Sequence, residues 1–213
     1  MANMIPPESL LEFYRKGVFP MAGPDGLRLF SPDPRGILPL EAFHIPHGTR
    51  RAWKEKAWEW RVDSCFPEVL LACSEREETW IDETIFCSYV SLHQAGHAHS
   101  IEIWADGELA GGLYGVRIGA AFFGESMFHR VTNASKLALC YLVALLKKSG
   151  FLLLDIQWVT PHLSGFGAIE IPRADYHRML ARALKKKTDF PNLDATPADL
   201  FEDAGGSAGP GVS

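Results

Sequence analysis

The segment that most constrains the fold is the run FLLLDIQ at residues 151–157. It is short and almost entirely apolar, which is typical of a strand buried in the middle of a sheet. One aspartate, Asp155, interrupts the run, and a buried carboxylate is costly unless it is paired or hydrogen-bonded. Strand alternation places Asp155 and Gln157 on one face and Ile156 on the other. Two interpretations stay open: a ligand site at the carboxyl end of a buried strand, or an aspartate that only fixes a loop backbone.

The residues around this strand form a regular pattern. We expect two helices, capped by Asp63 and Asp82, and then strands over 99–105, 108–118 and 120–125, with Asp106-Gly107 as a hairpin turn between the first two. A long helix over 134–149 follows, capped by Thr132 or Asn133 and ending at Gly150. An amphipathic last helix is expected over 173–187.

This order of elements predicts an α+β fold with a mixed sheet and helices on both faces. N-acetyltransferase-like (GNAT-like) domains have the same order, so we expect a GNAT-like domain over residues 63–190. The preceding residues, 1–62, are rich in Pro and aromatics and predict a small N-terminal α+β domain. Residues 191–213 predict a disordered acidic tail.

Composition excludes several classes. The net charge of −5 argues against a protein that coats nucleic acid through bulk charge. No apolar run has the length of a membrane helix, and the first residues do not look like a secretion signal. The four cysteines show no CxxC pair. We therefore expect a cytoplasmic protein with free thiols and no membrane association.

The segment GESMF at residues 124–128 is the densest candidate for chemistry. Glu125, expected at a strand end, suits an amine, and Phe122, Met127 and Phe128 suit an apolar cavity. The alternative is a loop carboxylate that caps the next helix. Ser126 does not lie in the G-x-S-x-G motif of hydrolases, so no covalent intermediate is indicated.

Other binding motifs are weak. The residues Asn133–Lys136 can bind an anion at the start of the long helix, although an ordinary cap is the simpler interpretation. No Walker loop or G-x-G-x-x-G motif is present, and neither is the turn that binds the pyrophosphate of coenzyme A. His93, His97 and His99 lack the partners of a zinc site, so we expect no metal.

A basic cluster interleaved with tryptophans lies at residues 50–61. Such a mixture suits a surface that follows a nucleic-acid backbone, and a solvated helix is the alternative. The basic residues of this cluster are Arg50, Arg51, Lys54, Lys56 and Arg61.

Taken together, the segments resemble the leucyl/phenylalanyl-tRNA–protein transferase family. The similar segments are LFSPDPRGILPL, TWI, SLHQAGHAHSIEIW, GELAGGLYGVRIGAAFFGESMFHRVTNASKLAL, FLLLDIQ and HLSGFGAIEIPR. They run in the family's order from about Gly17 to Arg173. The combination of GESMF, NASK, D-x-Q and GA-x-EIPR is highly specific.

The resemblance implies transfer of Leu or Phe (also Met) from aminoacyl-tRNA to proteins that begin with Arg or Lys, which marks them for N-end rule degradation. It implies no metal or coenzyme, and we expect a monomer. In this family Asp155 would polarise Gln157, Gln157 would help to draw a proton from the acceptor amine, and Glu125 would hold the amino group of the donor residue. The side-chain pocket would comprise Leu113, Phe122, Met127, Leu142 and Leu154. The terminal adenine would stack between Phe30 and Trp80, and Arg50, Arg51, Lys54 and Lys56 would bind the tRNA.

The sequence departs from the family at three places. The family usually has two tryptophans where Leu29 and Phe30 stand, Met at Leu113 and Cys at Ile156. Phe30 offers a smaller stacking face than tryptophan. Alternative hypotheses are the same fold with a different acyl donor, a shift of acceptor to N-terminal Asp or Glu, and a non-catalytic protein that binds tRNA or a degradation signal.

Overall fold

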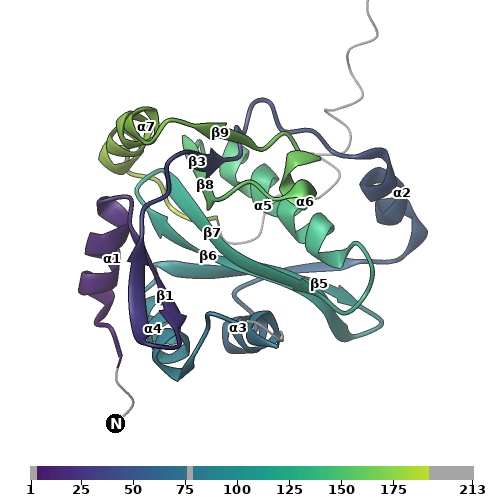
Figure 1. The fold of residues 1–213 in the computed structure, drawn as a ribbon. Helices are drawn as coiled ribbons and strands as arrows, with labels where there is room; N and C mark the ends of the chain where they lie inside the picture. The colour runs from purple at the N-terminus through teal and green to yellow at the C-terminus, as the bar shows by residue number, and fades with distance from the viewer. Residues whose placement is uncertain (1–3, 76–78, 192–213) are drawn as a thin grey trace, which may run out of the picture.

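A computed structural model describes residues 4–75 and 79–191 of the 213-residue chain. Seven strands form one mixed sheet in the order β4-β5-β6-β7-β8-β3-β9, and β1 pairs with β2 in a separate hairpin (Figure 1). The strands are β1 (Phe19–Gly23), β2 (Gly26–Phe30), β3 (Arg35–Ile37), β4 (Glu59–Val62), β5 (Ala98–Ala105), β6 (Glu108–Ile118), β7 (Ala121–His129), β8 (Leu153–Gln157) and β9 (Ile169–Ile171). The helices are α1 (Pro7–Arg15), α2 (His47–Glu55), α3 (Phe66–Ser74), α4 (Glu83–Gln94), α5 (Ala134–Lys148), α6 (Pro161–Ser164) and α7 (Arg173–Lys185).

The centre of the sheet is a meander followed by a crossover. Asp106 and Gly107 have φ of 54° and 79°, as the tight turn between antiparallel β5 and β6 requires. Antiparallel β7 follows, and α5 carries the chain back so that β8 lies parallel to β7. All five residues of β8 are buried, which confirms the prediction of a buried inner strand from FLLLDIQ.

Helices cover both faces of this sheet. On one face, α1, α3, α4 and α7 pack around a core that includes Tyr14, Tyr89 and Phe123. On the other face, α5 is buried along twelve of its fifteen residues because its sequence is apolar on nearly all sides. The predicted α+β fold with a mixed sheet and helices on both faces is therefore confirmed, while the closer likeness to GNAT domains stays a prediction.

The N-terminal residues supply part of the main sheet. β3 lies between β8 and β9, with Gly36 paired to Gln157 and Glu170, and β4 pairs with β5. The division of the chain at residue 62 into two domains stays a prediction. The predicted disordered tail falls outside the described residues apart from Pro191.

Three local predictions need correction. Asp82 caps α4 as expected, but Asp63 does not cap α3: its carboxylate accepts from the Ser100 amide at 2.8 Å. The buried carboxylate of Glu102 instead accepts from the amides of Ser64 and Cys65, just before α3. Asn133 stands at the cap position of α5 without a side-chain cap hydrogen bond.

The third correction concerns the strand expected over 120–125: β7 runs on to His129, so Glu125 lies inside the strand and not at its end. The strand continues because β6 is long enough to pair with it as far as Gly111.

Among the described residues, no helix is long and apolar enough to cross a membrane.

Gly36 tests how closely β3 packs against the backbone that follows β8. A Cβ at this position would lie 2.7 Å from the carbonyl carbon of Trp158 and 2.9 Å from the amide nitrogen of Val159. Because backbone atoms cannot give way as a side-chain tip can, we expect Gly36→Ala to lower the free energy of unfolding by about 2 kcal/mol. Thermal or urea unfolding measures this. Gly48→Ala, whose Cβ would meet nothing within 4 Å, is the matched control and should not destabilise the protein; equal stabilities of the two variants would contradict the prediction.

Candidate functional site

A bulge in β7 sets the direction of Glu125. Tyr114 pairs with Ser126 and Gly115 pairs with Gly124, so Glu125 is the extra residue that no residue of β6 opposes. Such a bulge kinks a strand and redirects a side chain. Gly115 is needed here, since a Cβ would overlap the carbonyl oxygen of Phe123 and the ring of Phe122.

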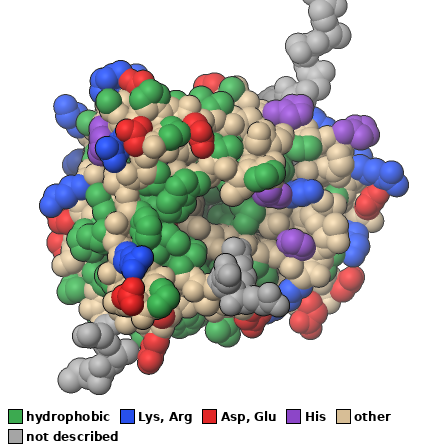
Figure 2. All heavy atoms as spheres, viewed as in Figure 1, with side chains coloured by type: hydrophobic (Ala, Val, Ile, Leu, Met, Phe, Trp, Pro, Cys, Tyr) green, Lys and Arg blue, Asp and Glu red, His purple; other side chains and the backbone are tan. Residues whose placement is uncertain are grey.

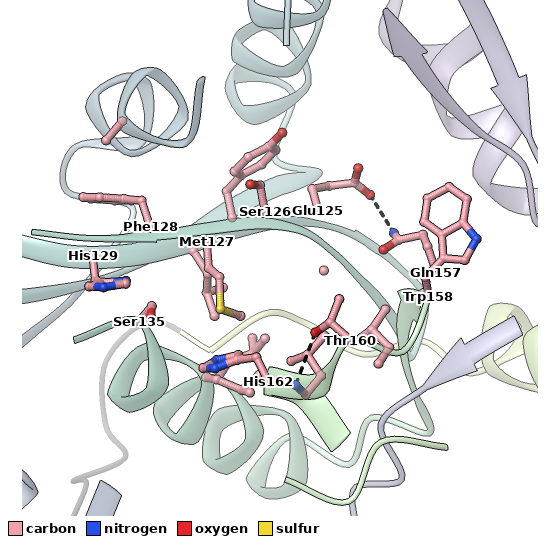
Figure 3. A pocket seen from close by; sticks show the side chains of 18 of the residues that line it. Glu125, Ser126, Met127, Phe128, His129, Ser135, Gln157, Trp158, Thr160 and His162 are labelled. Carbon is pink, nitrogen blue, oxygen red and sulfur yellow. Dashed lines mark hydrogen bonds between the residues drawn. The ribbon is translucent and has the colours of Figure 1, made fainter. Parts of the chain in front are cut away.

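The carboxyl group of Glu125 belongs to a chain of hydrogen-bonded polar side chains. The Tyr89 hydroxyl donates to Glu125 Oε2 at 3.2 Å, and the hydroxyls of Tyr14 and Tyr89 hydrogen-bond to each other. On the other side, Gln157 Nε2 donates to Glu125 Oε1 at 3.2 Å (Figure 3). Burial raises the pKa of Glu125 to about 8, although the hydrogen bonds of Tyr14 and Tyr89 oppose the shift. Burial also raises the pKa of both tyrosines, so at neutral pH this chain of groups is uncharged.

Asp155 is fully buried and paired. Arg35 donates to both of its oxygens, from Nε at 2.9 Å and from Nη2 at 2.6 Å. The Tyr176 hydroxyl adds a third donor at 2.7 Å and the Gln157 backbone amide a fourth at 2.9 Å. Burial alone would lower the pKa of Arg35, but the hydrogen bonds and charge of Asp155 raise it. Asp155 is thus paired with a fixed cation and accepts four hydrogen bonds.

Arg35 itself is held in place from several directions. Its guanidinium lies 5.0 Å from the ring centre of Phe19 and 4.5 Å from that of Tyr176. Nη1 donates to the carbonyl oxygen of Gly17 at 2.9 Å. This one side chain therefore joins the end of α1, strand β3, strand β8 and helix α7.

The chain turns sharply at the end of β8. Gln157 has a φ of 57°, and the Trp158 amide donates to the Ile156 carbonyl at 2.6 Å. Left-handed backbone is unfavourable for a residue with a side chain and persists where surrounding contacts enforce it. Here the Asp155 carboxylate, which accepts from the Gln157 amide, supplies one such contact.

A pocket of about 670 Å³ opens beside these groups. Figure 2 shows the hollow on this face, and Figure 3 shows Glu125, Gln157 and Trp158 toward one end, with His129, Ser135 and His162 toward the other. The predicted pocket residues Leu113, Met127, Leu142 and Leu154 line it, together with Trp80, Phe19 and Met21.

Some predicted residues lie elsewhere. Phe122 does not line the pocket; it is fully buried and stacks on Phe190 at 5.4 Å between ring centres. Phe30 is half-buried against Phe19 and Trp158 and is also absent from the lining. Asp155 lies behind the pocket and reaches it only through Gln157.

The predicted tRNA-binding residues belong to α2 and the residue after it. Arg51 pairs with Glu55 at 2.7 Å, and the ammonium group of Lys56 lies 5.7 Å from the ring centre of Trp58. Neither Arg50 nor Lys54 is among the pocket residues. This strip is therefore separate from the pocket.

Four residues of the site carry no signal in the sequence that marks them as site residues. Asp155 required a buried partner, but nothing in the sequence selects Arg35 from the 21 basic residues of the chain. Tyr14, Tyr89 and Tyr176 lie on the apolar faces of helices, where a tyrosine looks like an ordinary core residue. In the described part of the chain, no group of three or more His, Cys, Asp or Glu residues suits a metal ion.

Comparisons with known proteins place this arrangement in a family. The sequence profile described as "Leucyl/phenylalanyl-tRNA protein transferase" matches residues 37–181. The chain belongs to the leucyl/phenylalanyl-tRNA–protein transferase family. The resemblance inferred from the motifs is therefore confirmed.

Relatives named leucyl/phenylalanyl-tRNA–protein transferase align over most of the chain. One from Akkermansia muciniphila is 50% identical and covers 88% of this chain and 100% of its own. One from Salinibacter ruber is 48% identical, covering 94% and 90%. One from Paramagnetospirillum magneticum is 54% identical, covering 85% and 90%.

The Arg35–Asp155 pair is expected to dominate the stability of the site. Arg35→Met leaves a buried carboxylate without its counter-charge, so the free energy of unfolding should fall by about 3–5 kcal/mol in urea titrations. Arg51→Ala, which breaks an exposed pair with Glu55, is the matched control and should cost less than about 1 kcal/mol. If the two variants lose similar amounts of unfolding free energy, the buried pair contributes no more to stability than the exposed pair, and the prediction is wrong.

Glu125 should make stability depend on pH. Its pKa of about 8 in the folded protein exceeds the ordinary value of 4.5 that it has in the unfolded chain, so ionisation opposes folding progressively from about pH 4.5 to pH 8. Glu125→Gln removes this penalty. Because the residue is partly exposed, we expect the variant to be more stable than the original protein by about 2 kcal/mol at pH 9 and by less than about 1 kcal/mol at pH 5.5, measured by urea unfolding. A difference that does not change with pH would contradict the assignment.

Proposed function

We propose that this protein transfers Leu or Phe, and also Met, from aminoacyl-tRNA to the N-terminal amine of acceptor proteins that begin with Arg or Lys. The observation that carries the proposal is the pocket in which an apolar floor meets the pair Glu125–Gln157 at its rim. Family membership supplies the class of donor. The product would carry a new N-terminal residue that marks it for N-end rule degradation in the cytoplasm.

The floor of the pocket suits the donor side chain. Leu113, Met127, Leu142 and Leu154 offer only apolar atoms, and the flexible Met127 adapts to chains of different shape. A charged donor side chain would lose its hydration without gaining a partner at this floor. Leu, Phe and Met, which carry apolar side chains without a β-branch, are the donors that fit. Phe122, buried behind the lining, supports this wall.

Glu125 suits the amino group of the donor. In the free protein its raised pKa keeps it protonated at neutral pH. An ammonium group beside it stabilises the carboxylate and lowers the pKa, so binding of the donor would release the proton and form an ion pair. Tyr89 and Gln157 hold the two oxygens of Glu125 in place for this contact.

The reaction is aminolysis of an ester. The acceptor's neutral α-amine attacks the ester carbonyl, a C–N bond forms, and the C–O bond to the terminal ribose breaks. The proton lost by the amine ends on the ribose oxygen that leaves. Gln157 is a poor Brønsted base, so its role is to orient the amine and relay the proton, and much of the rate comes from positioning.

Asp155 acts through Gln157. Its hydrogen bond goes to the backbone amide of Gln157 and not to the side chain, so it fixes the turn that presents the glutamine. Its charge is balanced by Arg35. Asp155 is therefore a positioning residue in this proposal, and the predicted polarisation of Gln157 would pass through the peptide group.

The rest of the donor would extend from the pocket. Trp80 lines the pocket and would stack on the terminal adenine. Phe30, the other residue predicted to stack on the adenine, contacts the ring of Trp158 beside the pocket. The basic residues Arg50, Arg51, Lys54 and Lys56 would contact phosphates of the tRNA, with a steep dependence on salt.

The test is a transfer assay. Radiolabelled Leu-tRNA or Phe-tRNA is mixed with the protein and peptides that begin with Arg, Lys, Asp or Glu. We expect label on the Arg and Lys peptides only. Label on the Asp and Glu peptides instead would indicate a shifted acceptor, and no label on any peptide would overturn the proposal in favour of a binding protein.

Variants test the assigned roles in the same assay. Gln157→Ala should lower kcat about 100-fold because the amine loses its oriented partner. Gln94→Ala, at the exposed end of α4, is the matched control and should leave kcat unchanged. Asp155→Asn should lower kcat while circular dichroism shows a folded protein. Full activity in both site variants would remove Gln157 and Asp155 from the mechanism.

A further inference from the structure

Trp158 is an unusual side chain for its position. The residue is 42% exposed. Among the described residues, it is the only aromatic one in the group of large hydrophobic residues that are exposed. It also lines the pocket and directly follows Gln157 (Figure 3). A single exposed apolar side chain needs no explanation by itself, but an exposed indole that also lines a pocket offers its ring to a ligand bound there.

The backbone that carries Trp158 is fixed on both sides. The left-handed Gln157 and the hydrogen bond from the Trp158 amide to Ile156 set the turn, and Gly36 of β3 packs directly against the Trp158 backbone. The tryptophan is therefore presented at the pocket by a rigid turn and not by a free loop.

The ring is supported by two phenylalanines. Phe19 meets it edge-on, with ring centres 5.1 Å apart at an interplanar angle of 87°, and Phe30 meets it at 6.1 Å and 70°. Phe30 also stacks on Phe19, with ring centres 6.1 Å apart. Phe30 packs into this group and does not line the pocket, whereas Phe19 and Trp158 do, as does Trp80.

We propose that Trp158 is a stacking face for the terminal base of the donor RNA, and that Phe30 acts by supporting Trp158. The inference rests on the proposed function, which brings a terminal adenosine to this pocket. Stacking on a planar base needs a ring face and no charge, and every base has such a face.

The lining favours a base over the cationic side chain of an acceptor. Phe19, Met21, Trp80 and Trp158 carry no charge, and Glu125 is held protonated at neutral pH until an ammonium group reaches it. An Arg or Lys side chain on Trp158 would gain a cation–π contact, but none of these four residues provides a carboxylate to pair with it. The other acidic residue of the lining, Glu75, already pairs with Arg130 at 3.9 Å.

Steady-state transfer with Phe-tRNA and an Arg-initiated peptide separates the two substrates. We expect Trp158→Ala to raise the KM for Phe-tRNA about tenfold, with kcat and the KM for the peptide within about twofold of the original values. Trp158→Phe should recover most of the donor affinity because it keeps a ring face. Phe30→Ala should raise the donor KM less than Trp158→Ala does. Met179→Ala, exposed on α7 and absent from the pocket, is the matched control and should change nothing.

Free nucleosides test the base contact directly. Adenosine should inhibit transfer by competing with Phe-tRNA and should quench tryptophan fluorescence, whereas uridine, with a smaller ring, should do both more weakly. Trp158→Ala should weaken the inhibition by adenosine by the same factor as it raises the donor KM. Trp158→Phe should lose part of the quenching. This fluorescence measurement does not depend on enzyme activity, so it tests whether the base contacts Trp158 even if Trp158→Ala does not fold.

The inference is overturned if Trp158→Ala leaves both the donor KM and adenosine inhibition unchanged. It is also overturned if the KM rises only for the peptide, which would assign the ring to the acceptor, or if Trp158→Phe binds the donor as poorly as Trp158→Ala. These results are distinct from failure of the proposed function, in which the original protein itself transfers no label.

Discussion

The site depends on one buried ion pair, the bidentate contact between Arg35 and Asp155. Neither residue reaches solvent, and the pair joins segments 120 residues apart in sequence. Removing two charges from water is unfavourable unless their remaining hydrogen-bonding capacity is used, and Tyr176, Gly17 and the Gln157 amide use it here. Because the same carboxylate holds the turn at Gln157, the interaction that joins β3 to β8 also sets the geometry of the pocket rim.

Beside this charged pair lies a polar chain that is neutral. Tyr14, Tyr89, Glu125 and Gln157 are connected by hydrogen bonds, and burial keeps the first three protonated near pH 7. The two systems meet at Gln157, whose amide contacts Asp155 and whose side chain contacts Glu125. The Arg35–Asp155 pair is therefore a structural contact, while in the proposed function a charge on Glu125 would appear only when the donor's ammonium group arrives. In the proposed function, this separation would let the rim bind an amine without maintaining an unpaired carboxylate beforehand.

Much of this fold could be predicted from local sequence, because the strands and helices of residues 82–185 follow clear periodicities and turn signals. The Asp106-Gly107 turn, the cap at Asp82 and the strand FLLLDIQ are examples. What failed depended on distant residues. Glu102 takes the role expected of Asp63, and β6 extends β7 past Glu125. The same holds for the site: motifs identified Glu125, Asp155 and Gln157, but the partners Arg35, Tyr14, Tyr89 and Tyr176 come from other segments that only the fold brings near.

The position of β3 has a consequence for how the protein is made. This three-residue strand, synthesised early, can take its place only between β8 and β9, which leave the ribosome after more than a hundred further residues. Contacts of such long sequence separation form late in folding because the intervening chain must first be ordered. Until then Arg35 has no Asp155 and the turn at Gln157 has no support from Gly36. A nascent chain interrupted before β8 therefore has no functional rim, and the pocket is assembled only when synthesis of the sheet is complete.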